Sequence, residues 1–533
     1  MKNRIKQYLL AASMCVGLTA CSDFFEPIPG VQFGLDETFA SKQRTEEYLN
    51  NVYSYVREVT DAIHPNTYGG IFTEASLDGA NRWNKTYAEW TNGSFNSASA
   101  QASEYFSKYY QAIAKASTFI QNVDKCTEAA ASTRGKWKSE ARALRAYYYF
   151  ELLRLYGPIP LIGEDPIPLD ASLEELIKER NSVDECVNFI ATELQSAIDS
   201  GDLLQRAGKA NLGRMDVATC MALKAKLYLY WASPLFNGNT DQASVKNKDG
   251  KQLFPQTEDH SKWTQARDAY ERFMTFATGQ GYKLTEVYTN GKLDPYASCR
   301  AAGEFFTTTW EAVDELIFVK LRDLYDYTYW VCPKFTDFQD TDVTGGGGYY
   351  TTQETVDLFF TKDGLTIEED PGYDKFEGIP GTNNFTSGRY YDPNNPSRLY
   401  FDADKSKVLK QWKDREPRFY VNITYSGSIW LNEGKYNEEM RTDFTNGANG
   451  TCGKSKASGD CPDSGYLIRR GAKASNNNGS KHFSPVLRLA DMYLGYAEAL
   501  CMCSDLDNAL TYLNKIRVRA GIPEYLSLIH ISE

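Results

Sequence analysis

Aromatic rings flanked by amide and guanidinium groups occur in the polar, turn-prone segment 79–94. In chain order, these side chains are Arg82, Trp83, Asn84, Trp90 and Asn92. A ring packs on the flat apolar face of a sugar, while polar groups at its edge bind the hydroxyls through directional hydrogen bonds. The segment therefore predicts a ligand-binding surface of the kind that grips carbohydrate. The alternative is that one of the two tryptophans packs the base of the loop.

A second aromatic group lies in the segment 325–330, which reads Tyr-Asp-Tyr-Thr-Tyr-Trp. In an extended strand the side chains alternate, so one side would carry Trp330 and the other would carry Tyr325, Tyr327 and Tyr329. We predict ligand contacts in this segment. A strand face that packs into the core is the alternative.

Tyr349 and Tyr350 form a third candidate group, directly after four consecutive glycines at 345–348. In a phosphate-binding glycine loop, Lys and then Ser or Thr follow at a strand-to-helix junction, and this run has neither feature. The glycines therefore indicate an irregular turn that carries two rings. Loops on a rigid scaffold are a usual place for binding residues.

The sequence contains no pattern that identifies a catalytic centre or a metal site. No GxSxG or HExxH motif is present, and the 4 histidines are scattered. With 70 acidic residues, a glycosidase-type carboxylate pair cannot be identified without geometry. Asp337, Asp340 and Asp342 lack EF-hand spacing and predict a solvated acidic loop, so calcium stays an unsupported alternative. We expect a protein that is not an enzyme and uses no cofactor.

Residues 1–21 resemble a bacterial lipoprotein signal. Three basic residues within the first six precede an apolar stretch, 8–18, that is too short to span a bilayer. The stretch ends in Leu-Thr-Ala-Cys, which is similar to a lipobox and implies removal of residues 1–20 and acylation of Cys21. The Ser and Asp that follow Cys21 resemble surface-export signals of Bacteroidetes-type lipoproteins. An ordinary secreted protein is the alternative.

The overall composition is that of a globular protein with an acidic surface. Of the 533 residues, 42% are hydrophobic and 24% are charged, and the net charge is −12. This charge argues against a nucleic-acid partner, which requires a basic surface. We expect an outer-membrane protein that faces the cell exterior, with residues 21–40 as a lipid-anchored tether.

The 11 cysteines do not suggest a disulfide scaffold, because two belong to the N-terminal segment and nine is an odd number. Cys452 and Cys461 lie nine positions apart in a Gly/Ser/Lys-rich loop and are a weak candidate for a disulfide. Three others fit the pattern of buried small hydrophobic residues: Cys186, Cys220 and Cys501.

Helical periodicity dominates residues 41–284 and returns in residues 484–525. In the segment 140–156, one helix face consists of Ala141, Leu144, Tyr148, Leu152 and Leu155. Gly157 and Pro158 end this pattern. The same period predicts helices in the segments 183–200, with Asp184 as a possible N-cap, 214–231, 263–277, 486–500 and 506–516.

Three segments are loose copies of one another: ARALRAYYYF, CMALKAKLYLY and RLADMYLGYAEAL. Small Ala residues alternate with Leu and Tyr at helical spacing, which resembles the tetratricopeptide repeat. We therefore predict a mainly α fold, namely a tetratricopeptide-repeat-like helical scaffold with an inserted, loop-rich, partly β binding region at 285–483. Within this insertion, 315–320 and 418–425 look like strands. A plain helical bundle is the alternative.

Several segments in the same order resemble the SusD/RagB family of outer-membrane nutrient-binding lipoproteins. They are DFFEPIP after Cys21, EARALRAYYYFELLRLYGPIPLI at 140–162, ALKAKLYLYWASPLFNGN at 222–239, TVDLFFTKDG at 355–364, REPRFYVNI at 415–423, and VLRLADMYLGYAEAL with NALTYLNKIRVRAGIP at 486–523. The resemblance implies capture of glycans, or of peptides in the RagB branch, for a TonB-dependent transporter of the SusC type. It also implies that early Trp and Asn residues, and rings of the insertion, contact the ligand. A helical-repeat lipoprotein that binds only other proteins is a separate alternative, which a long apolar groove would favour.

The end of the sequence departs from the family pattern. Family members usually continue beyond the RAG motif with further helical sequence, whereas this chain ends in LSLIHISE at 526–533. We expect this tail to be non-native and the natural protein to be longer.

Overall fold

The computed structural model describes most of the chain beyond residue 33. The described residues are 34–57, 63–64, 67–68, 76, 79–81, 93–165, 167–168, 171–303, 314–322, 329–335, 345–374, 384–431, 440–445, 452–453, 460–472 and 482–526. The predicted signal peptide 1–20, Cys21 and the residues after 526 lie outside these ranges. Nowhere in the described part is a helix both long enough and apolar enough to cross a bilayer.

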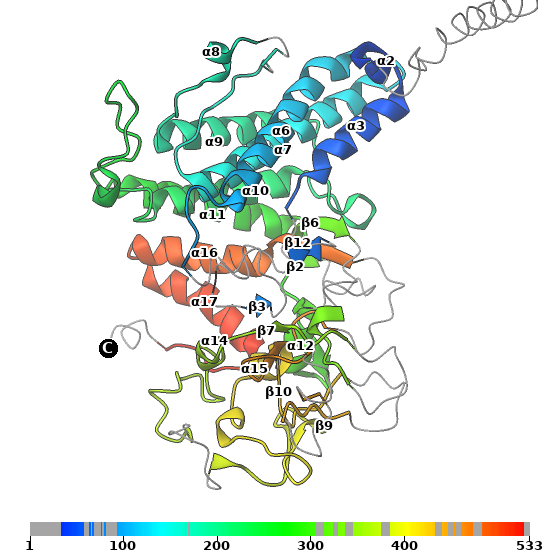
Figure 1. Cartoon of the computed structure of the whole chain (residues 1–533), viewed down its shortest axis with the longest axis vertical. Helices are drawn as coiled ribbons and strands as arrows, with labels where there is room; N and C mark the ends of the chain where they lie inside the picture. The colour runs from blue at the N-terminus through cyan, green and yellow to red at the C-terminus, as the bar shows by residue number, and fades with distance from the viewer. Residues whose placement is uncertain are drawn as a thin grey trace, which may run out of the picture.

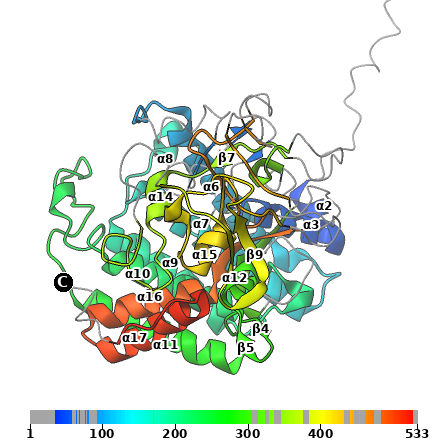
Figure 2. The same ribbon diagram turned by 90° about the horizontal axis from the view of Figure 1, so that it is seen from below.

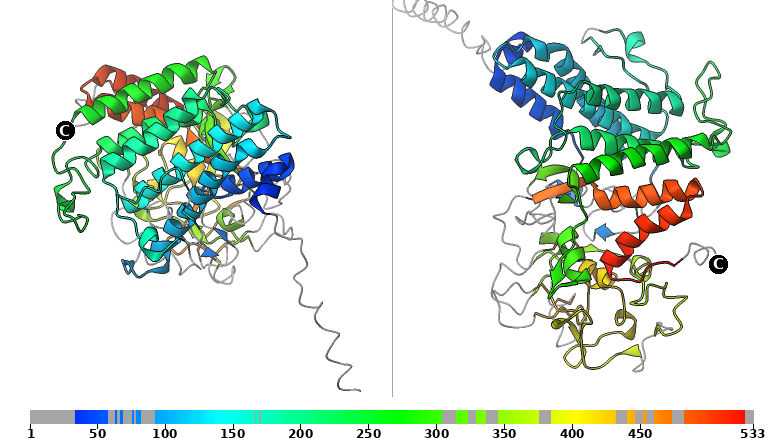
Figure 3. Two further views of the ribbon diagram at one scale, coloured as in Figure 1. Left: turned by 90° about the horizontal axis from the view of Figure 1, so that it is seen from above. Right: turned by 180° about the vertical axis from the view of Figure 1, so that it is seen from behind.

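A stack of helices forms one half of the molecule (Figures 1 and 3). Each helix packs against the next one along the chain, from α3 through α6, α7, α9, α10 and α11, and then against α16 and α17. Their bounds are α2 Leu35–Ala40, α3 Lys42–Ser54, α6 Ala100–Asn122, α7 Ala131–Tyr156, α9 Val183–Asp199, α10 Val217–Ala232, α11 Ser261–Gly279, α16 Leu489–Met502 and α17 Leu506–Ala520. The predicted mainly α fold with a helical scaffold is confirmed, and two of its helices, α16 and α17, follow the insertion.

Helix α7 is buried on all sides over its central turns. Tyr147, Tyr148, Tyr149 and Phe150 are all at most 2% exposed, because α6 covers one face of the helix and α9 covers another. The helix ends at Gly157, whose φ of 68° is unfavourable for a residue with a side chain. Because Tyr147 and Phe150 are buried together with the face predicted from the sequence, the helix has two apolar faces and lies between two neighbours.

The N-terminus of α9 is capped by Ser182 and not by Asp184, so that prediction was wrong. Ser182 and Glu185 form a reciprocal capping box. Asp184 instead accepts hydrogen bonds from the indole of Trp231 at 2.6 Å and from Lys262 at 2.9 Å. It therefore joins α9 to α10 and α11.

The insertion enters and leaves the helical stack through a pair of adjacent strands. Strand β6 (Leu316–Arg322) pairs antiparallel with β12 (His482–Arg488), and β6 packs on α10. The hydroxyl of Thr219 in α10 donates to the carbonyl of Ile317 at 3.3 Å. We call this pair of strands the stem.

Beyond the stem, the other half of the molecule consists of short helices, small sheets and loops (Figure 2). A four-stranded sheet has the order β10-β11-β7-β3, with bounds Ile423–Tyr425, Tyr466–Ile468, Tyr349–Tyr350 and Ala80–Asn81. Strand pairs are formed by β1 Ile63–His64 with β2 Thr67–Tyr68, β4 Tyr288–Thr289 with β5 Lys292–Leu293, and β8 Arg389–Asp392 with β9 Asn395–Asp402. The short helices include α12 Pro295–Gly303, α14 Gln353–Asp357 and α15 Pro417–Asn422.

The two strands that the sequence suggested in the insertion have different outcomes. The segment 315–320 lies almost entirely in β6, as predicted. Most of 418–425 is helix α15, and only its last three residues form a strand, so this prediction was largely wrong. Pro417 at the first helical position fixes φ for a helix, which overrides the β propensity of the residues that follow it.

The core divides into one large cluster in the helical stack and smaller clusters in the insertion. Three tryptophans of the helical stack are buried, namely Trp137, Trp231 and Trp263. Cys186 and Cys220 are buried, whereas Cys501 is exposed, so the prediction for that residue was wrong.

No disulfide joins Cys452 to Cys461, which corrects the weak prediction of a bridge. Both side chains are buried, but only Cys452 belongs to the cluster that contains Cys332 and Trp430. The backbone of Cys452 is held separately, by a hydrogen bond from its N–H to the carbonyl of Asp443 at 2.9 Å.

A fully buried carboxylate fastens α17 to the stem. Glu315, immediately before β6, is 0% exposed and accepts two hydrogen bonds from the guanidinium of Arg519, at 2.9 and 2.8 Å. It also accepts from Arg488 at 3.3 Å and from the backbone N–H of Thr285 at 2.8 Å. Burial alone would raise the pKa of Glu315, but the two guanidinium groups hold that pKa below its usual value.

Candidate ligand-binding site

Strand β3 brings the first predicted aromatic segment next to the third. Ala80 pairs with Tyr350 and Asn81 pairs with Tyr349, while Tyr350 pairs on its other side with Leu467. Asn81 is followed directly by the segment whose candidates are Arg82, Trp83, Asn84, Trp90 and Asn92. These residues lie outside the described part of the chain, as do Tyr325 and Tyr327. For them the ligand contacts stay a prediction.

The four glycines hold the second predicted segment against the third. The N–H groups of 345, 346, 347 and 348 donate to the carbonyls of Pro333, Tyr329, Cys332 and Trp330, at 3.0, 2.8, 2.9 and 3.1 Å. A Cβ at Gly346 would lie 2.3 Å from the indole of Trp330, which is well inside van der Waals contact. The glycines are therefore required for close approach, and the backbone at Gly346 packs directly against the Trp330 ring.

Tyr329 and Trp330 are half-buried, and their rings meet edge to face with centroids 5.0 Å apart. Residues 329–331 are helical, so the predicted alternation of an extended strand does not apply to this pair. A helical turn lets neighbouring rings contact each other, whereas a strand would send them to opposite faces.

The two tyrosines of β7 have different surroundings. Tyr349 is only 3% exposed and packs in the cluster that contains Phe335 and Trp430, so its ring belongs to the core. Its prediction as a ligand contact is corrected accordingly. Tyr350 is half-buried. Adjacent residues in a strand face opposite sides, so burial of one ring leaves the other directed away from this cluster.

We call Tyr329, Trp330 and Tyr350 the aromatic surface. The base under Trp330 is apolar, because this ring packs on a cluster that includes buried Val331, Trp430 and Leu431. Burial raises the pKa of the Cys332 thiol in this base, so the thiol stays protonated at neutral pH and is a poor nucleophile. The arrangement suits non-covalent stacking on a flat ligand face.

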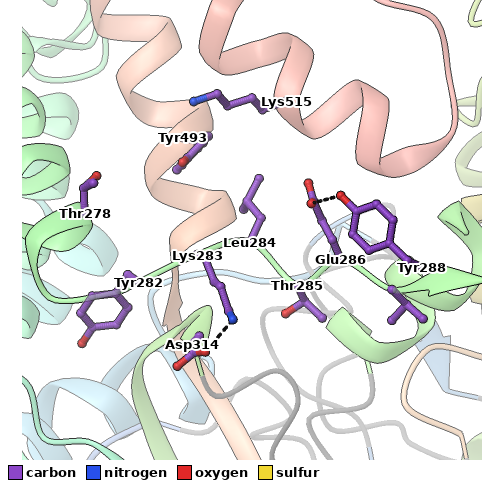
Figure 4. A pocket seen from close by; sticks show the side chains of 11 residues that line it. Thr278, Tyr282, Lys283, Leu284, Thr285, Glu286, Tyr288, Asp314, Tyr493 and Lys515 are labelled. Atoms are coloured by element: carbon purple, nitrogen blue, oxygen red, sulfur yellow. Dashed lines mark hydrogen bonds and ion pairs between the residues drawn. The ribbon is translucent and has the colours of Figure 1, made fainter. Parts of the chain in front are cut away.

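Another cavity lies between α11, α16, α17 and the segment 282–288 (Figure 4). It has a volume of about 860 Å³. The ammonium group of Lys515 in α17 lies over the ring of Tyr493 in α16, 5.5 Å from its centroid, and Tyr288 of the same cavity is 60% exposed. Two carboxylates of this cavity already have partners within the protein. Asp314 forms a salt bridge with Lys283 at 3.3 Å, and Glu286 accepts a hydrogen bond from the Tyr288 hydroxyl at 2.9 Å.

A second cavity of about 570 Å³ lies in the insertion, and we call it the Tyr373 pocket. Rings and polar side chains line it together: Gln353, Asp357, Ile367, Glu368, Tyr373, Leu409, Gln411, Trp412, Ser426, Phe444, Thr445, Ser464 and Tyr466. The sequence analysis missed this set. Its members come from five separate segments between 353 and 466, so no local spacing could have revealed them.

A third cavity, of about 420 Å³, is an apolar groove between α6 and the segment 160–178. Its lining includes Phe106, Tyr110 and Ile113 of α6 and, at the rim, Leu176 and Ile177. The short helix α8 (Leu173–Leu176) lies at this rim, and Leu173 and Ile177 are 73% and 69% exposed. Among the described residues, no group of three or more His, Cys, Asp or Glu side chains is placed to hold a metal ion.

Two family models match this chain over separate ranges. The model described as "SusD family" matches residues 315–527, and one described as "Starch-binding associating with outer membrane" matches residues 32–229. A SusD-like protein of Bacteroides ovatus is 27% identical over 175 residues. That match spans 32% of this chain and 30% of the length of the relative.

Solved structures share the fold along nearly the whole chain. A protein designated BT4246 superposes with a TM-score of 0.73 at 24% identity, over 91% of this chain and 83% of that one. A SusD-like protein of Bacteroides fragilis superposes with a TM-score of 0.65 at 21% identity, over 93% of this chain and 83% of that one. A laminarin-binding SusD-like protein superposes with a TM-score of 0.56 at 17% identity, over 92% of this chain and 87% of that one. At these identities the likeness concerns the fold.

Proposed function

This chain belongs to the SusD family, and from that premise we propose that it captures glycan at the cell surface for import. The captured glycan would pass to a TonB-dependent transporter of the SusC type. Binding is non-covalent and needs no catalytic step. The family description of outer-membrane association and starch binding, and the name of the laminarin-binding neighbour, support this class of ligand.

The observation that carries the proposal is the aromatic surface backed by glycine. Trp330 packs on the backbone of Gly346, which fixes the plane of the indole before any ligand arrives. A preorganised ring avoids the entropy cost of ordering a side chain on binding. Strand β3, which contains Asn81, pairs with β7, which contains Tyr350 of the aromatic surface.

The membrane anchor and the transporter are parts of the same proposal. Acylation of Cys21 would hold the protein at the outer membrane, since several acyl chains give firm attachment. The resemblance of residues 18–21 to a lipobox supports the anchor. Family membership supports the transporter as partner.

Binding of a peptide or of another protein is the second candidate function, and the apolar groove favours it. This groove runs along α6 and carries exposed Ile177 at its rim. Exposed apolar clusters of this kind commonly mark interaction surfaces. A RagB-type peptide binder, or a lipoprotein that binds only proteins, would use such a groove.

An array that contains polysaccharides, host glycans and peptides tests the two candidates together. The full chain, purified in mild detergent, is applied after circular dichroism has shown that it is folded. We expect selective binding to one glycan class, and we expect Trp330→Ala to weaken it about tenfold or more, since the ring supplies most of the stacking area. Tyr391→Ala removes a partly exposed ring on β8 and serves as the matched control.

Binding of peptides alone, lost in Ile177→Ser and unchanged in Trp330→Ala, would overturn the glycan proposal in favour of the second candidate. Glycan binding that Trp330→Ala leaves unchanged would contradict the role of the aromatic surface.

A further inference from the structure

The Tyr373 pocket combines ring faces with hydrogen-bonding side chains at the wall of one cavity. Its volume of about 570 Å³ lies within the range of roughly 300–1,000 Å³ found for small-molecule sites. Tyr373 and Phe444 are half-buried, so each is packed on one side and reaches the cavity on another. The polar members are amides, hydroxyls and two carboxylates.

A hydrogen-bond network fixes the inner wall of the pocket. The Tyr466 hydroxyl accepts from the indole N–H of Trp412 at 3.0 Å and donates to the side-chain oxygen of Gln353 at 2.7 Å. The amide of Gln353 in turn donates to Asp357 at 2.7 Å. Every side chain in this network is held by a hydrogen bond to a neighbour, so the wall is preorganised for a ligand.

Tyr373 is held in a similar way at the side of the pocket. Its hydroxyl donates to the carbonyl of Gln411 and accepts from the guanidinium of buried Arg415 at 2.8 Å. The guanidinium carbon of Arg415 lies 5.4 Å from the centroid of the Tyr373 ring. The ring therefore has a fixed orientation, which a stacking platform requires.

The charge of the pocket selects against anions. Asp357 and Glu368 both line it, and Lys and Arg are absent from its described lining. Burial raises the pKa of Asp357, and the nearby charge of Glu368 acts in the same direction. Carboxylates accept hydrogen bonds from hydroxyl groups but repel sulfates and uronic acids.

We infer that the Tyr373 pocket is a second glycan-binding site, which takes neutral oligosaccharide. This inference rests on the proposed glycan capture and adds a separate place and a charge preference to it. The site uses the rings of Tyr373 and Phe444 for apolar contact, and Gln353, Gln411 and the two carboxylates for the sugar hydroxyls.

The two sites are connected through β11 and through Phe444. Leu467 in β11 pairs with Tyr350 of the aromatic surface, and its neighbour Tyr466 lines the Tyr373 pocket. Phe444 lines the pocket and also packs on the cluster that lies beneath Trp330. One polysaccharide that binds both sites gains affinity from effective concentration, without any new contact.

Calorimetric titration of the full chain with neutral and acidic polysaccharides tests the inference. The probes are laminarin, soluble starch, mannan and xylan as neutral glycans, and polygalacturonate as the acidic one. Ser464→Arg fills the pocket from an exposed position of its lining, whereas Asp463→Arg places the same side chain one residue earlier, outside the lining, and is the matched control. Tyr373→Ala removes the platform.

We expect a neutral polysaccharide to bind and polygalacturonate not to bind. Ser464→Arg and Tyr373→Ala should each weaken binding about three- to tenfold, with Asp463→Arg unchanged. Tyr373→Ala also removes a contact of Arg415, so the melting temperature of this variant is measured as well. If Tyr373→Ala unfolds, the binding measured for Ser464→Arg alone tests the inference. The binding that remains in Ser464→Arg should disappear when Trp330→Ala is added to it.

Neutral-glycan binding that is unchanged in Ser464→Arg, and is lost in Trp330→Ala, would overturn the second site and leave the proposed function intact. If polygalacturonate also binds, and Ser464→Arg weakens its binding, the charge preference is overturned. If none of the neutral polysaccharides binds, both the second site as defined here and capture of these glycans are contradicted.

Discussion

At the scale of single residues, the glycine at 346 matters as much as the tryptophan that it supports. The indole of Trp330 lies against the backbone because position 346 has no Cβ, and the N–H of that glycine is bonded to the carbonyl of Tyr329. Side-chain chemistry alone therefore does not define the binding surface. Gly346 positions the ring although it has no side chain of its own.

Gly346→Ala should displace the Trp330 ring. The new Cβ would lie 2.3 Å from the indole, so the ring or the turn must move, at a cost of about 1–3 kcal/mol in stability. We expect glycan affinity to fall together with the melting temperature, as measured by titration and by calorimetry. Gly163→Ala is the control, because a Cβ there meets nothing within 4 Å. Equal behaviour of the two variants would show that the close approach has no effect.

The sequence predicted the aromatic candidates at this scale but not their surroundings. Tyr349 and Tyr350 looked equivalent in the sequence, and only the packing of the folded chain shows that the first ring enters the core. The Tyr373 pocket was not predicted because its residues come together through the fold of the insertion. Cys501 looked like a buried residue, yet it lies on the exposed side of α16, since a helical pattern near its end does not fix which face is covered.

At the scale of elements, the helices were predictable and the pairing of strands was not. The period of apolar residues in α7, α9, α10 and α11 is local, so a short window of sequence contains it. The pairing of Ala80 with Tyr350 joins residues far apart in the chain and leaves no local signal. The segment 418–425 shows the intermediate case, in which a proline at a helix start overrides residues that favour strands.

Glu315 should be the most sensitive charged residue of the stem. Glu315→Gln would leave Arg519 and Arg488 without their buried counter-charge, so we expect a loss of about 3–5 kcal/mol in the free energy of unfolding. Asp314→Asn, one residue earlier, removes ion pairs of a carboxylate that is 40% exposed and should cost less than about 1 kcal/mol. Denaturant unfolding measures both. Similar losses in the two variants would contradict the role of burial.

The same carboxylate predicts a dependence of stability on pH. Its pKa is lowered in the folded protein, so its stabilising effect is complete above the unfolded pKa of about 4.3 and is lost as the pH falls through the folded value. Acid titration of the melting temperature should therefore show a steeper decline below about pH 4.3 in the natural protein than in Glu315→Gln. Parallel curves for the two proteins would contradict this assignment.

At the scale of the whole molecule, a helical stack with a large core supports a half that is rich in loops. The stack has one continuous core, whereas the insertion has smaller ones. The net charge of −12 keeps the protein away from polyanions without assisting the contact with a neutral sugar.

Affinity for a neutral glycan should depend little on salt. Stacking and hydrogen bonds to neutral hydroxyls are not screened by ions, so we expect the Kd to change less than about twofold between about 0.05 and 0.5 M NaCl. Titration at several salt concentrations measures this. A Kd that rises steeply with salt would show that charged groups dominate the contact, and would argue for an ionic ligand.

The stem also bears on how such a protein could acquire a new ligand. The insertion leaves the stack at Arg322 and returns at His482, and these two residues are paired neighbours. The part of the chain between them is also held elsewhere, because β7 pairs with β3, and Ala520 and Ile522 pack in a core cluster of the insertion. A foreign segment with closely spaced ends could be joined at the stem if it also replaced these contacts. Ligand specificity could then diversify by exchange of the segment between Arg322 and His482, while the helical stack around α7 is inherited unchanged.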